Sequence, residues 1–175
     1  CQLFHRNQRL ACIVLRTSRF FPEEDDSKAV RDVYADDNLK TNEYLHRRVE
    51  IADVVSAHLL AAGRAPAIGF AKYIVSATTP FTQGDLAELR RDAPATARRR
   101  VPEYEAEYKR RCWQMFPAID RVYVNERARA DLGWRPRYDF THVIERLRAG
   151  HGVTSPLAEA IGSKGYHDER FAEGP

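Results

Sequence analysis

This 175-residue chain lacks several features that define common classes of protein. Its cysteines, Cys1, Cys12 and Cys112, are odd in number and not closely paired, which excludes a disulfide framework and indicates free thiols in a reducing compartment. No apolar run approaches the roughly 20 residues that span a bilayer, and no signal or transit segment is visible. We therefore expect a cytoplasmic protein that makes no contact with a membrane.

The common catalytic signatures are also missing. A dinucleotide-binding loop needs three spaced glycines, and the nearest candidate, Gly150-His151-Gly152, has Ser155 at the third position. The sequence has no Gly-Lys-Ser/Thr phosphate loop and no Gly-x-Ser-x-Gly nucleophile turn. None of the six histidines has a His or Cys at metal-ligand spacing on a clear helix face. These absences argue against a metal site and against a phosphate loop within the chain.

Charge gives no indication of nucleic-acid binding. The net charge of +3 is small and spread out. The arginine-rich segment 90–112 also carries interleaved glutamates, which would repel phosphates. We interpret this segment as a solvated helical surface with one aromatic edge at Tyr104 and Tyr108. With 43% hydrophobic residues, the chain has the composition of an ordinary globular protein. Its length predicts one domain, with two small lobes as the alternative.

Hydrophobic periodicity predicts alternating strands and helices, which is typical of an α/β fold. The predicted strands cover residues 11–16, 48–51, 72–77 and 120–125. The predicted helices include residues 2–9, 42–48, 52–63 and 139–150, with a further short helix in the tail after residue 150. The run 11–16 is apolar almost throughout, as in strands covered on both faces of a parallel sheet, yet a lone strand cannot bury both faces.

Local signals set several helix boundaries and faces. Thr82 precedes Asp85 by three residues, which predicts a capping box. Asn125 is predicted to cap the next helix, and Gly133 to end it in the left-handed conformation. Gly63 is predicted to end the helix that starts at residue 52. Leu3 and Phe4 are expected to face inward. In 139–150, the helical spacing predicts an apolar stripe of Phe140, Val143, Ile144 and Leu147.

Four segments resemble the NAD-dependent epimerase/dehydratase family, the extended short-chain dehydrogenases/reductases. They are "VLRTSRFFPE", "RRVEIADVVSAHLLA", "YIVSATTPFTQGDLAEL" and "NERARADLGWRPRYDF", which resemble the family's "LRPxNVYGP", "RDYIHVxDVAxA", "YNVGxGxxxSxxEL" and "SKAxxELGWxPxxxL". They occur in the family's order and lie within residues 3–150. The resemblance implies the last elements of a Rossmann-type parallel sheet plus the smaller C-terminal substrate-binding lobe.

The resemblance also implies a site just beyond the first strand, because ligands bind outside the carboxyl ends of such strands. Thr17 and Ser18 fall where the family contacts the nicotinamide. Arg19 replaces an asparagine that holds the substrate, and Phe20 and Phe21 fall on the wall of the substrate lobe. An alternative is that the two phenylalanines are core and that Arg19 pairs with the acidic residues 23–26.

A second part of the implied substrate site is basic. In nucleotide-sugar members of the family, an arginine opens the "RDYIHV" stretch and grips a phosphate. His46 stands at that place here, with Arg47 and Arg48 beside it. Either arginine could take the role, since a guanidinium matches phosphate or carboxylate oxygens at two points.

The family's catalytic pair, a tyrosine four residues before a lysine, does not occur at any lysine of this chain. In the family, that pair and the glycine loop precede the strand that starts here at residue 11. We therefore expect residues 1–175 to be the C-terminal portion of a longer enzyme, inactive alone and without catalytic residues of its own. The full enzyme would use NAD or NADP, whereas no cofactor is expected for this chain alone.

The expected function is that of an NAD(P)-dependent epimerase, dehydratase or reductase acting on a sugar nucleotide or a related small polar substrate. Its expected partner is this small molecule, and a homodimer with a second copy of the chain is possible. Binding to nucleic acid is not expected. The alternative is a non-catalytic lobe that binds a ligand or a partner subunit. A basic nucleic-acid-binding module is a distant third.

Overall fold

The computed structural model of the chain describes residues 1–162. Within these residues the sheet consists of two parallel strands, β1 (Cys12–Thr17) and β2 (Phe70–Val75). The strands pair in register from Cys12 opposite Phe70 to Thr17 opposite Val75. Together with the helices they make a mixed α/β structure, as predicted, and both strands lie within two residues of their predicted positions.

The helix α4 (Ile51–Ile68) crosses between the two strands and packs on one face of the sheet. It runs through Gly63, so the predicted stop at that residue is wrong; the helix ends at Gly69, whose φ is 76°. A Cβ at Gly69 would lie 2.9 Å from His5 Cε1, so glycine is needed here for both conformation and space. The helix continues because Ile68, beyond Gly63, also packs on the sheet.

The inner face of α4 is part of a hydrophobic cluster that we call the sheet core. Its largest members are Val49, Val54, Tyr73, Leu132 and Trp134. By length and apolar composition, α4 is the one helix within residues 1–162 that could cross a membrane. Packing on the sheet accounts for the apolar character of its inner face only, since Val55 and Leu59 are exposed on its outer face.

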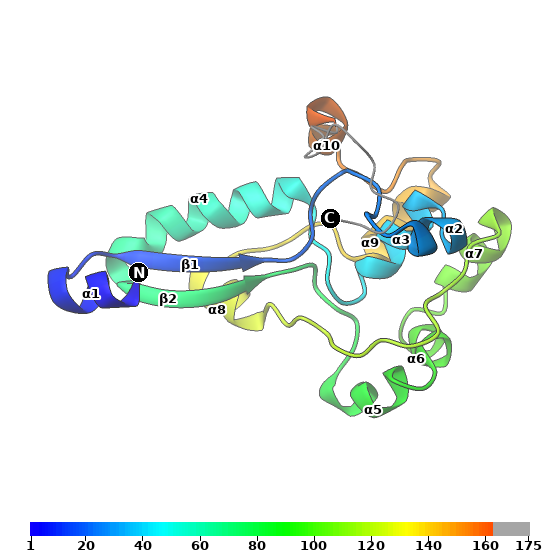
Figure 1. Cartoon of the computed structure of the whole chain (residues 1–175), viewed down its shortest axis with the longest axis horizontal. Coiled ribbons are helices and arrows are strands. Elements are labelled where there is room, and N and C mark those ends of the chain that lie inside the picture. The colour runs from blue at the N-terminus through cyan, green and yellow to red at the C-terminus, as the bar shows by residue number, and fades with distance from the viewer. Residues whose placement is uncertain (163–175) are drawn as a thin grey trace.

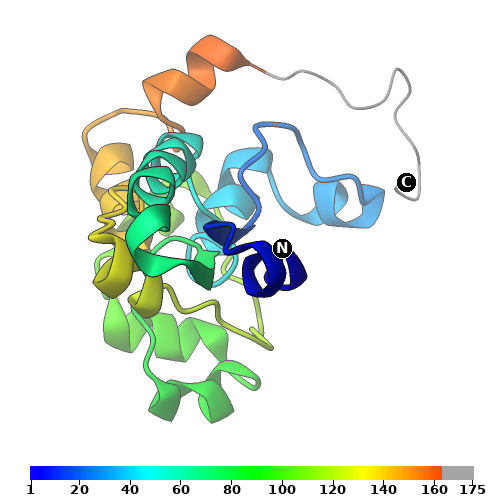
Figure 2. The same cartoon turned by 90° about the vertical axis from the view of Figure 1, so that its left-hand side faces the viewer.

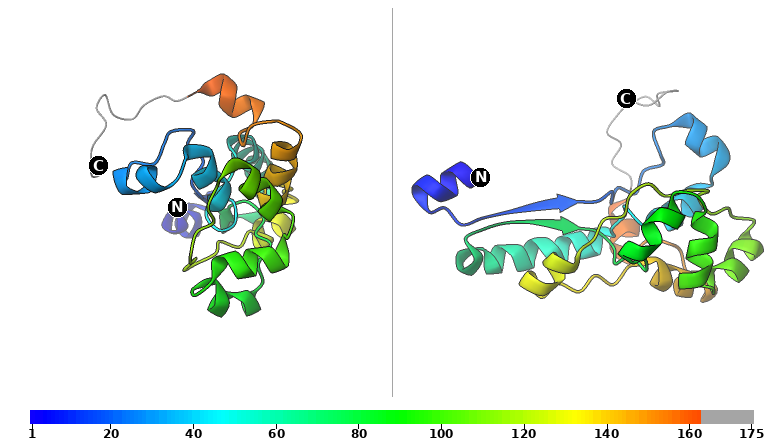
Figure 3. Two further views of the ribbon diagram at one scale, coloured as in Figure 1. Left: turned by 90° about the vertical axis from the view of Figure 1, so that its right-hand side faces the viewer. Right: turned by 90° about the horizontal axis from the view of Figure 1, so that it is seen from below.

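Within residues 1–162, the opposite face of the sheet carries no helical layer (Figure 3). Helices α4 and α8 (Glu126–Leu132) lie on the same side (Figures 2 and 3). The side chains that alternate with the sheet-core residues are half-buried or exposed. They are Cys12, Val14, Arg16, Phe70, Lys72 and Ile74. Within the described residues, the outer edge of β1 also has no partner strand. We call this surface the open face and edge of the sheet.

The remaining helices form a lobe at the far end of the molecule from α1 (Figure 1). They are α2 (Lys28–Val33), α3 (Asp36–Glu43), α5 (Leu86–Leu89), α6 (Ala93–Arg100), α7 (Tyr104–Arg111) and α9 (Phe140–Arg148), with a 3-10 turn at Gln83–Asp85. α1 (Gln2–Gln8) precedes β1, and α10 (Pro156–Ile161) is the predicted helix of the tail. The predicted stripe of α9, with Phe140 and Leu147 fully buried, lies in the centre of this lobe.

Several local predictions are confirmed and others are wrong. The capping box of Thr82 and Asp85 is present, and Gly133 ends α8 in the left-handed conformation. Asn125 precedes α8 but does not cap it, because its side-chain amide donates to Ser76 O and Thr78 Oγ1.

Side-chain burial differs from expectation at both ends of the chain. Leu3 and Phe4 are exposed, because α1 lies beyond the end of the sheet and has no buried residues. Tyr104 and Tyr108 are buried against Phe140 and not on a surface edge. The reason is that α7 lies against α9, so its aromatic side faces the lobe core.

Three predicted elements are not formed as expected. Residues 42–48 hold only the end of α3 and a turn, and 48–51 contribute one isolated bridge, Arg19 to Arg48, in place of a strand. Residues 120–125 have no regular secondary structure and belong to no sheet. The backbone there bonds to loops, with Tyr123 N donating to His46 O at 2.9 Å, which leaves no ladder for a neighbouring strand.

Candidate functional site

The site predicted beyond β1 begins where the strand leaves the sheet. Thr17 is the last residue of β1 and is exposed, whereas Ser18 is buried. Ser18 N donates to Val75 O at 2.8 Å, which continues the parallel pairing by one residue. The Ser18 hydroxyl is buried and has no hydrogen-bond partner within residues 1–162. An unpartnered buried hydroxyl is costly, so this group is available for a ligand or another chain segment.

Arg19 lies within a network of charges centred on the buried carboxylate of Glu43. Its guanidinium contacts Asp25 Oδ2 at 2.5 Å and Glu43 Oε1 at 3.3 Å. Burial lowers the pKa of Arg19, but the charges of Glu43 and Asp25 outweigh burial and leave the pKa raised. Arg19 therefore pairs with Asp25 of the acidic segment 23–26, which was the alternative that the sequence left open. This ion pair occupies the Arg19 guanidinium.

The two neighbouring arginines have different environments. Arg48 is buried, donates to Glu43 Oε2 at 3.0 Å and to Phe21 O at 2.8 Å, and is thus part of the interior. Arg47 contacts Glu43 Oε1 at 3.0 Å but remains half exposed. The backbone also joins this turn to the end of β1, because Arg19 N donates to Arg47 O and Val49 N to Arg19 O. Of the pair, Arg47 is the one that a ligand can reach.

Phe20 and Phe21 stack on each other, with ring centroids 4.4 Å apart. Phe20 packs against the sheet core, and Phe21 is partly exposed. The sequence left open whether both phenylalanines are core residues or form the wall of the substrate lobe, and the two differ in this respect. Phe20 belongs to the core, and Phe21 lies at the surface near the end of β1.

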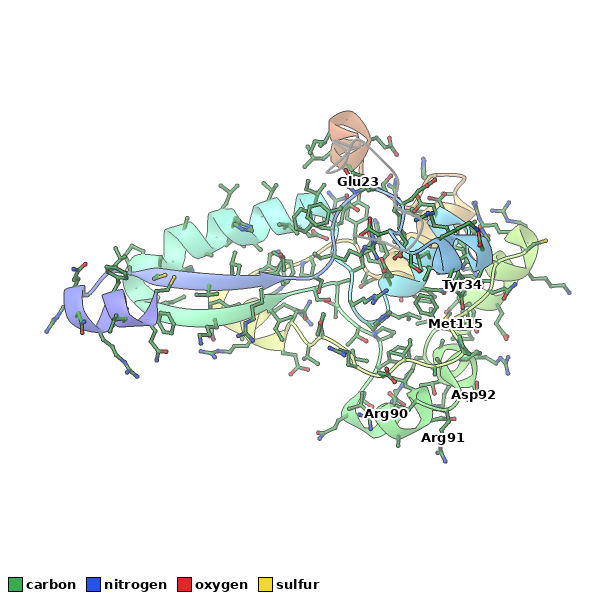
Figure 4. The ribbon with its side chains drawn as sticks, in the orientation of Figure 1. Glu23, Tyr34, Arg90, Arg91, Asp92 and Met115 are labelled. Atoms are coloured by element: carbon green, nitrogen blue, oxygen red, sulfur yellow. The ribbon has the colours of Figure 1, made fainter. Side chains whose placement is uncertain are left out.

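A pocket of about 420 Å³ lies at the turn that follows α3, and two of the predicted site residues, His46 and Arg47, line it. We call it the basic pocket. The rest of its lining consists of Phe116, Ala118, Ile119, Asp120, Arg121 and Tyr123. Tyr34, labelled in Figure 4, meets the Phe116 ring edge-on with centroids 5.2 Å apart.

The elements that hold the basic pocket are distant in sequence. One wall is the turn after α3, and the other is the extended segment 118–123. Tyr123 N donates to His46 O, and the side chain of Arg90, labelled in Figure 4, donates to Asp120 O at 3.4 Å. Backbone and side-chain bonds thus fix both walls relative to each other.

The positive charge of the basic pocket comes from its arginines. The pKa of His46 is lowered to about 4 because burial disfavours the charged ring and Arg47 repels it. The ring is therefore neutral near pH 7, and its buried Nδ1 has no hydrogen-bond partner within the described residues. Arg121 is exposed and has no ion pair or hydrogen bond from its side chain there. The pocket thus presents the two guanidinium groups, a neutral imidazole and the exposed carboxylate of Asp120, so its two positive charges outnumber its single negative charge.

Sequence reasoning missed Arg121 and Tyr123, because the pattern of residues 120–125 predicts a strand, and it missed Phe116, which no pattern in the sequence singles out. The alternation that suggested a strand does exist, but it separates two surfaces of an extended segment. Arg121, which stands between Asp120 and the apolar Val122, was the available signal.

The described residues contain no group of three or more His, Cys, Asp or Glu side chains placed to hold a metal ion. Comparison of the chain with protein-family models, curated proteins and solved structures finds no match. The basic pocket itself offers two guanidinium groups, the carboxylate of Asp120 and the rings of Phe116 and Tyr123.

Proposed function

We propose that this chain is the substrate-binding part of an NAD(P)-dependent oxidoreductase similar to the epimerase/dehydratase family, with the last strands of its Rossmann-type sheet. The basic pocket is the substrate site, and it takes a phosphorylated polar molecule such as a sugar nucleotide. The observation that carries the proposal is a pocket tied to the carboxyl end of β1 that is lined by the half-exposed Arg47 and by Arg121, whose side chain has no ion pair within residues 1–162.

The position of the pocket supports this assignment. In parallel α/β sheets, ligands bind in the crevice outside the carboxyl ends of the strands. β1 and β2 are parallel, and the turn that carries His46 and Arg47 is bonded to the chain directly after β1. Two guanidinium groups suit phosphate oxygens, and Phe116 and Tyr123 offer rings for a base or sugar.

The open face and edge of the sheet support the second part of the proposal. Parallel sheets occur almost only with both faces covered, and a strand pair on its own is marginal. Further parallel strands and helices, as in a Rossmann domain, would cover Val14 and Ile74 and pair with β1.

The chain's residues fit a nicotinamide cofactor only in part. The buried, unpartnered hydroxyl of Ser18 suits a contact with the nicotinamide end. The sequence has no glycine-rich loop for the pyrophosphate and no Tyr-x-x-x-Lys pair for the proton. We therefore derive no hydride-transfer step within this chain, and its own residues bind and orient the substrate.

Removing either guanidinium of the basic pocket is expected to weaken anion binding. A charge-assisted hydrogen bond contributes about 1.5–3 kcal/mol, so Arg121→Gln and Arg47→Gln should each raise the Kd for inorganic pyrophosphate by about ten- to a hundredfold. Isothermal titration calorimetry measures the effect. Arg6→Gln, on the exposed side of α1, is the matched control and should bind like the unaltered chain.

Equal affinity of all three variants would refute the assignment of the basic pocket as the substrate site.

Titration with NAD and NADP tests the other part of the proposal. Because the pyrophosphate site of a glycine-rich helix start is not in this sequence, both cofactors should bind only weakly. A micromolar Kd for either cofactor would contradict the proposal that this chain binds the substrate and that the cofactor site lies in another part of the enzyme.

The open face and edge of β1 are expected to cause association at high concentration, because unpaired strand backbone and apolar side chains bind one another. Light scattering over a dilution series should show an average mass that rises with concentration. Val14→Lys should reduce this rise because it places a charge on the open face. A single monomeric mass at every concentration would show that two strands suffice, and would count against the proposed covering domain.

A further inference from the structure

A second pocket, of about 540 Å³, lies beyond the end of β2. Its apolar wall is formed by Phe81, Leu86 and Val122, which also pack on the lobe core, and Val124 lies exposed at its rim. We call it the mixed pocket because charged and apolar side chains line it together. Its volume is within the range of small-molecule sites, about 300–1,000 Å³.

The mixed pocket is separate from the basic pocket. The extended segment 119–124 forms the wall between them, since Arg121 and Tyr123 line the basic pocket whereas Val122 and Val124 line the mixed pocket. The alternation of an extended chain places successive side chains on opposite surfaces. A substitution in one pocket can therefore be compared with a substitution in the other, because the two pockets share no lining residue.

Two opposite charges on α8 line the mixed pocket without neutralising each other. Glu126 and Arg129 are three residues apart in the helix, and their side chains make no ion pair or hydrogen bond within residues 1–162. By contrast, Arg127 on the same helix pairs with Asp131 at 3.4 Å. The mixed pocket thus combines an available carboxylate, an available guanidinium and an apolar wall.

The other polar groups of this pocket are largely occupied. Thr79 Oγ1 donates to Leu45 O, and Thr82 Oγ1 donates to Asp85. Thr78 Oγ1 accepts from Asn125. Within residues 1–162 the side-chain amide of Gln83 has no hydrogen bond. This neutral amide and the charges of Glu126 and Arg129 are therefore the groups left to fix the orientation of a ligand.

We propose that the mixed pocket binds a free amino acid with an apolar side chain. The α-carboxylate binds Arg129, whose guanidinium can donate two parallel hydrogen bonds. The α-ammonium binds Glu126, and the side chain lies against Phe81, Leu86 and Val122. A purely anionic or purely apolar ligand would leave at least one charge desolvated without a partner, whereas a zwitterion satisfies both.

Titration calorimetry with L-phenylalanine at neutral pH tests the proposal. We expect saturable binding, with about tenfold weaker binding of L-phenylalaninamide, which lacks the carboxylate, and of N-acetyl-L-phenylalanine, which lacks the ammonium. No saturation with L-phenylalanine up to about 10 mM, equal to less than roughly 3 kcal/mol of binding free energy, would overturn the proposal.

Variants on α8 assign the two contacts. Arg129→Gln should weaken L-phenylalanine binding about tenfold and abolish the difference between L-phenylalanine and its amide. Glu126→Gln should do the same for L-phenylalanine and its N-acetyl derivative. Arg127→Gln is the matched control and should leave all affinities unchanged. An unchanged affinity in Arg129→Gln, or persistence of the amide difference in that variant, would overturn the assignment.

This site does not depend on the function proposed above, and one measurement keeps the two apart. Arg129→Gln should bind inorganic pyrophosphate as the unaltered chain does, because Arg129 does not line the basic pocket. The reverse holds for Arg121→Gln, which should retain its affinity for L-phenylalanine.

Discussion

Replacing Glu43 by glutamine is expected to lower the free energy of unfolding by about 3–5 kcal/mol. The Glu43 carboxylate is almost fully buried and contacts Arg19, Arg47 and Arg48. Arg48 is itself 2% exposed. Without the carboxylate, its guanidinium would be a buried charge with no opposite charge, which is the costly state of a broken buried pair. Urea-induced unfolding, followed by circular dichroism, measures the loss.

A matched control for this prediction is Glu105→Gln. Glu105 pairs with Arg98, but both side chains are largely exposed, so the loss should stay below about 1 kcal/mol. Equal losses in the two variants would show that the Glu43 network does not stabilise the junction between the end of β1 and the turn after α3. Because this turn also carries Arg47, Glu43→Gln is expected to disturb the basic pocket in addition to the fold.

Replacing Trp134 by alanine is expected to cost a similar amount, about 3–5 kcal/mol, mainly through loss of buried packing. The Trp134 side chain is 0% exposed and lies in the sheet core, where α4, α8 and β2 meet. Its indole N–H donates to Asp53 O at 3.1 Å and to Ser56 Oγ at 3.0 Å. Unfolding in urea is again the measurement.

Two further variants separate the contributions at this position. Trp134→Phe keeps most of the buried ring and loses the N–H donor, so it should cost less than the alanine variant. Leu59→Ala, on the outer face of α4 where the side chain is 70% exposed, should change stability by less than about 0.5 kcal/mol. A large loss in Leu59→Ala would mean that the outer face of α4 is covered in solution.

Sequence alone determined those elements whose signals are local. The capping box at Thr82 and Asp85 and the left-handed Gly133 depend on bonds or backbone angles within a few residues. The buried stripe of α9 follows from the 3.6-residue period, and the apolar runs gave both parallel strands. For the site, sequence and resemblance indicated the chain just after β1 and the basic turn at 46–48.

Only the tertiary structure decided which of the adjacent residues Arg47 and Arg48 has a solvent-accessible side chain. Both are equally basic in sequence, but the turn after α3 directs Arg48 to the buried Glu43 and leaves Arg47 half exposed. The same holds for Arg19, whose pairing partners are 6 and 24 residues away. Such choices depend on long-range charges and desolvation, which no periodicity records.

Residues 120–125 are the clearest case in which a correct local pattern led to the wrong structure. Their alternation of polar and apolar residues is real, but a strand also needs a neighbouring backbone with free hydrogen-bonding groups. Here the backbone bonds to the turn at His46 and, from Ile119 just before the segment, to the end of α5 at Leu89. The alternation therefore separates two pockets instead of two faces of a sheet, because the position of these neighbouring elements, and not the sequence of the segment, determines what each side chain contacts.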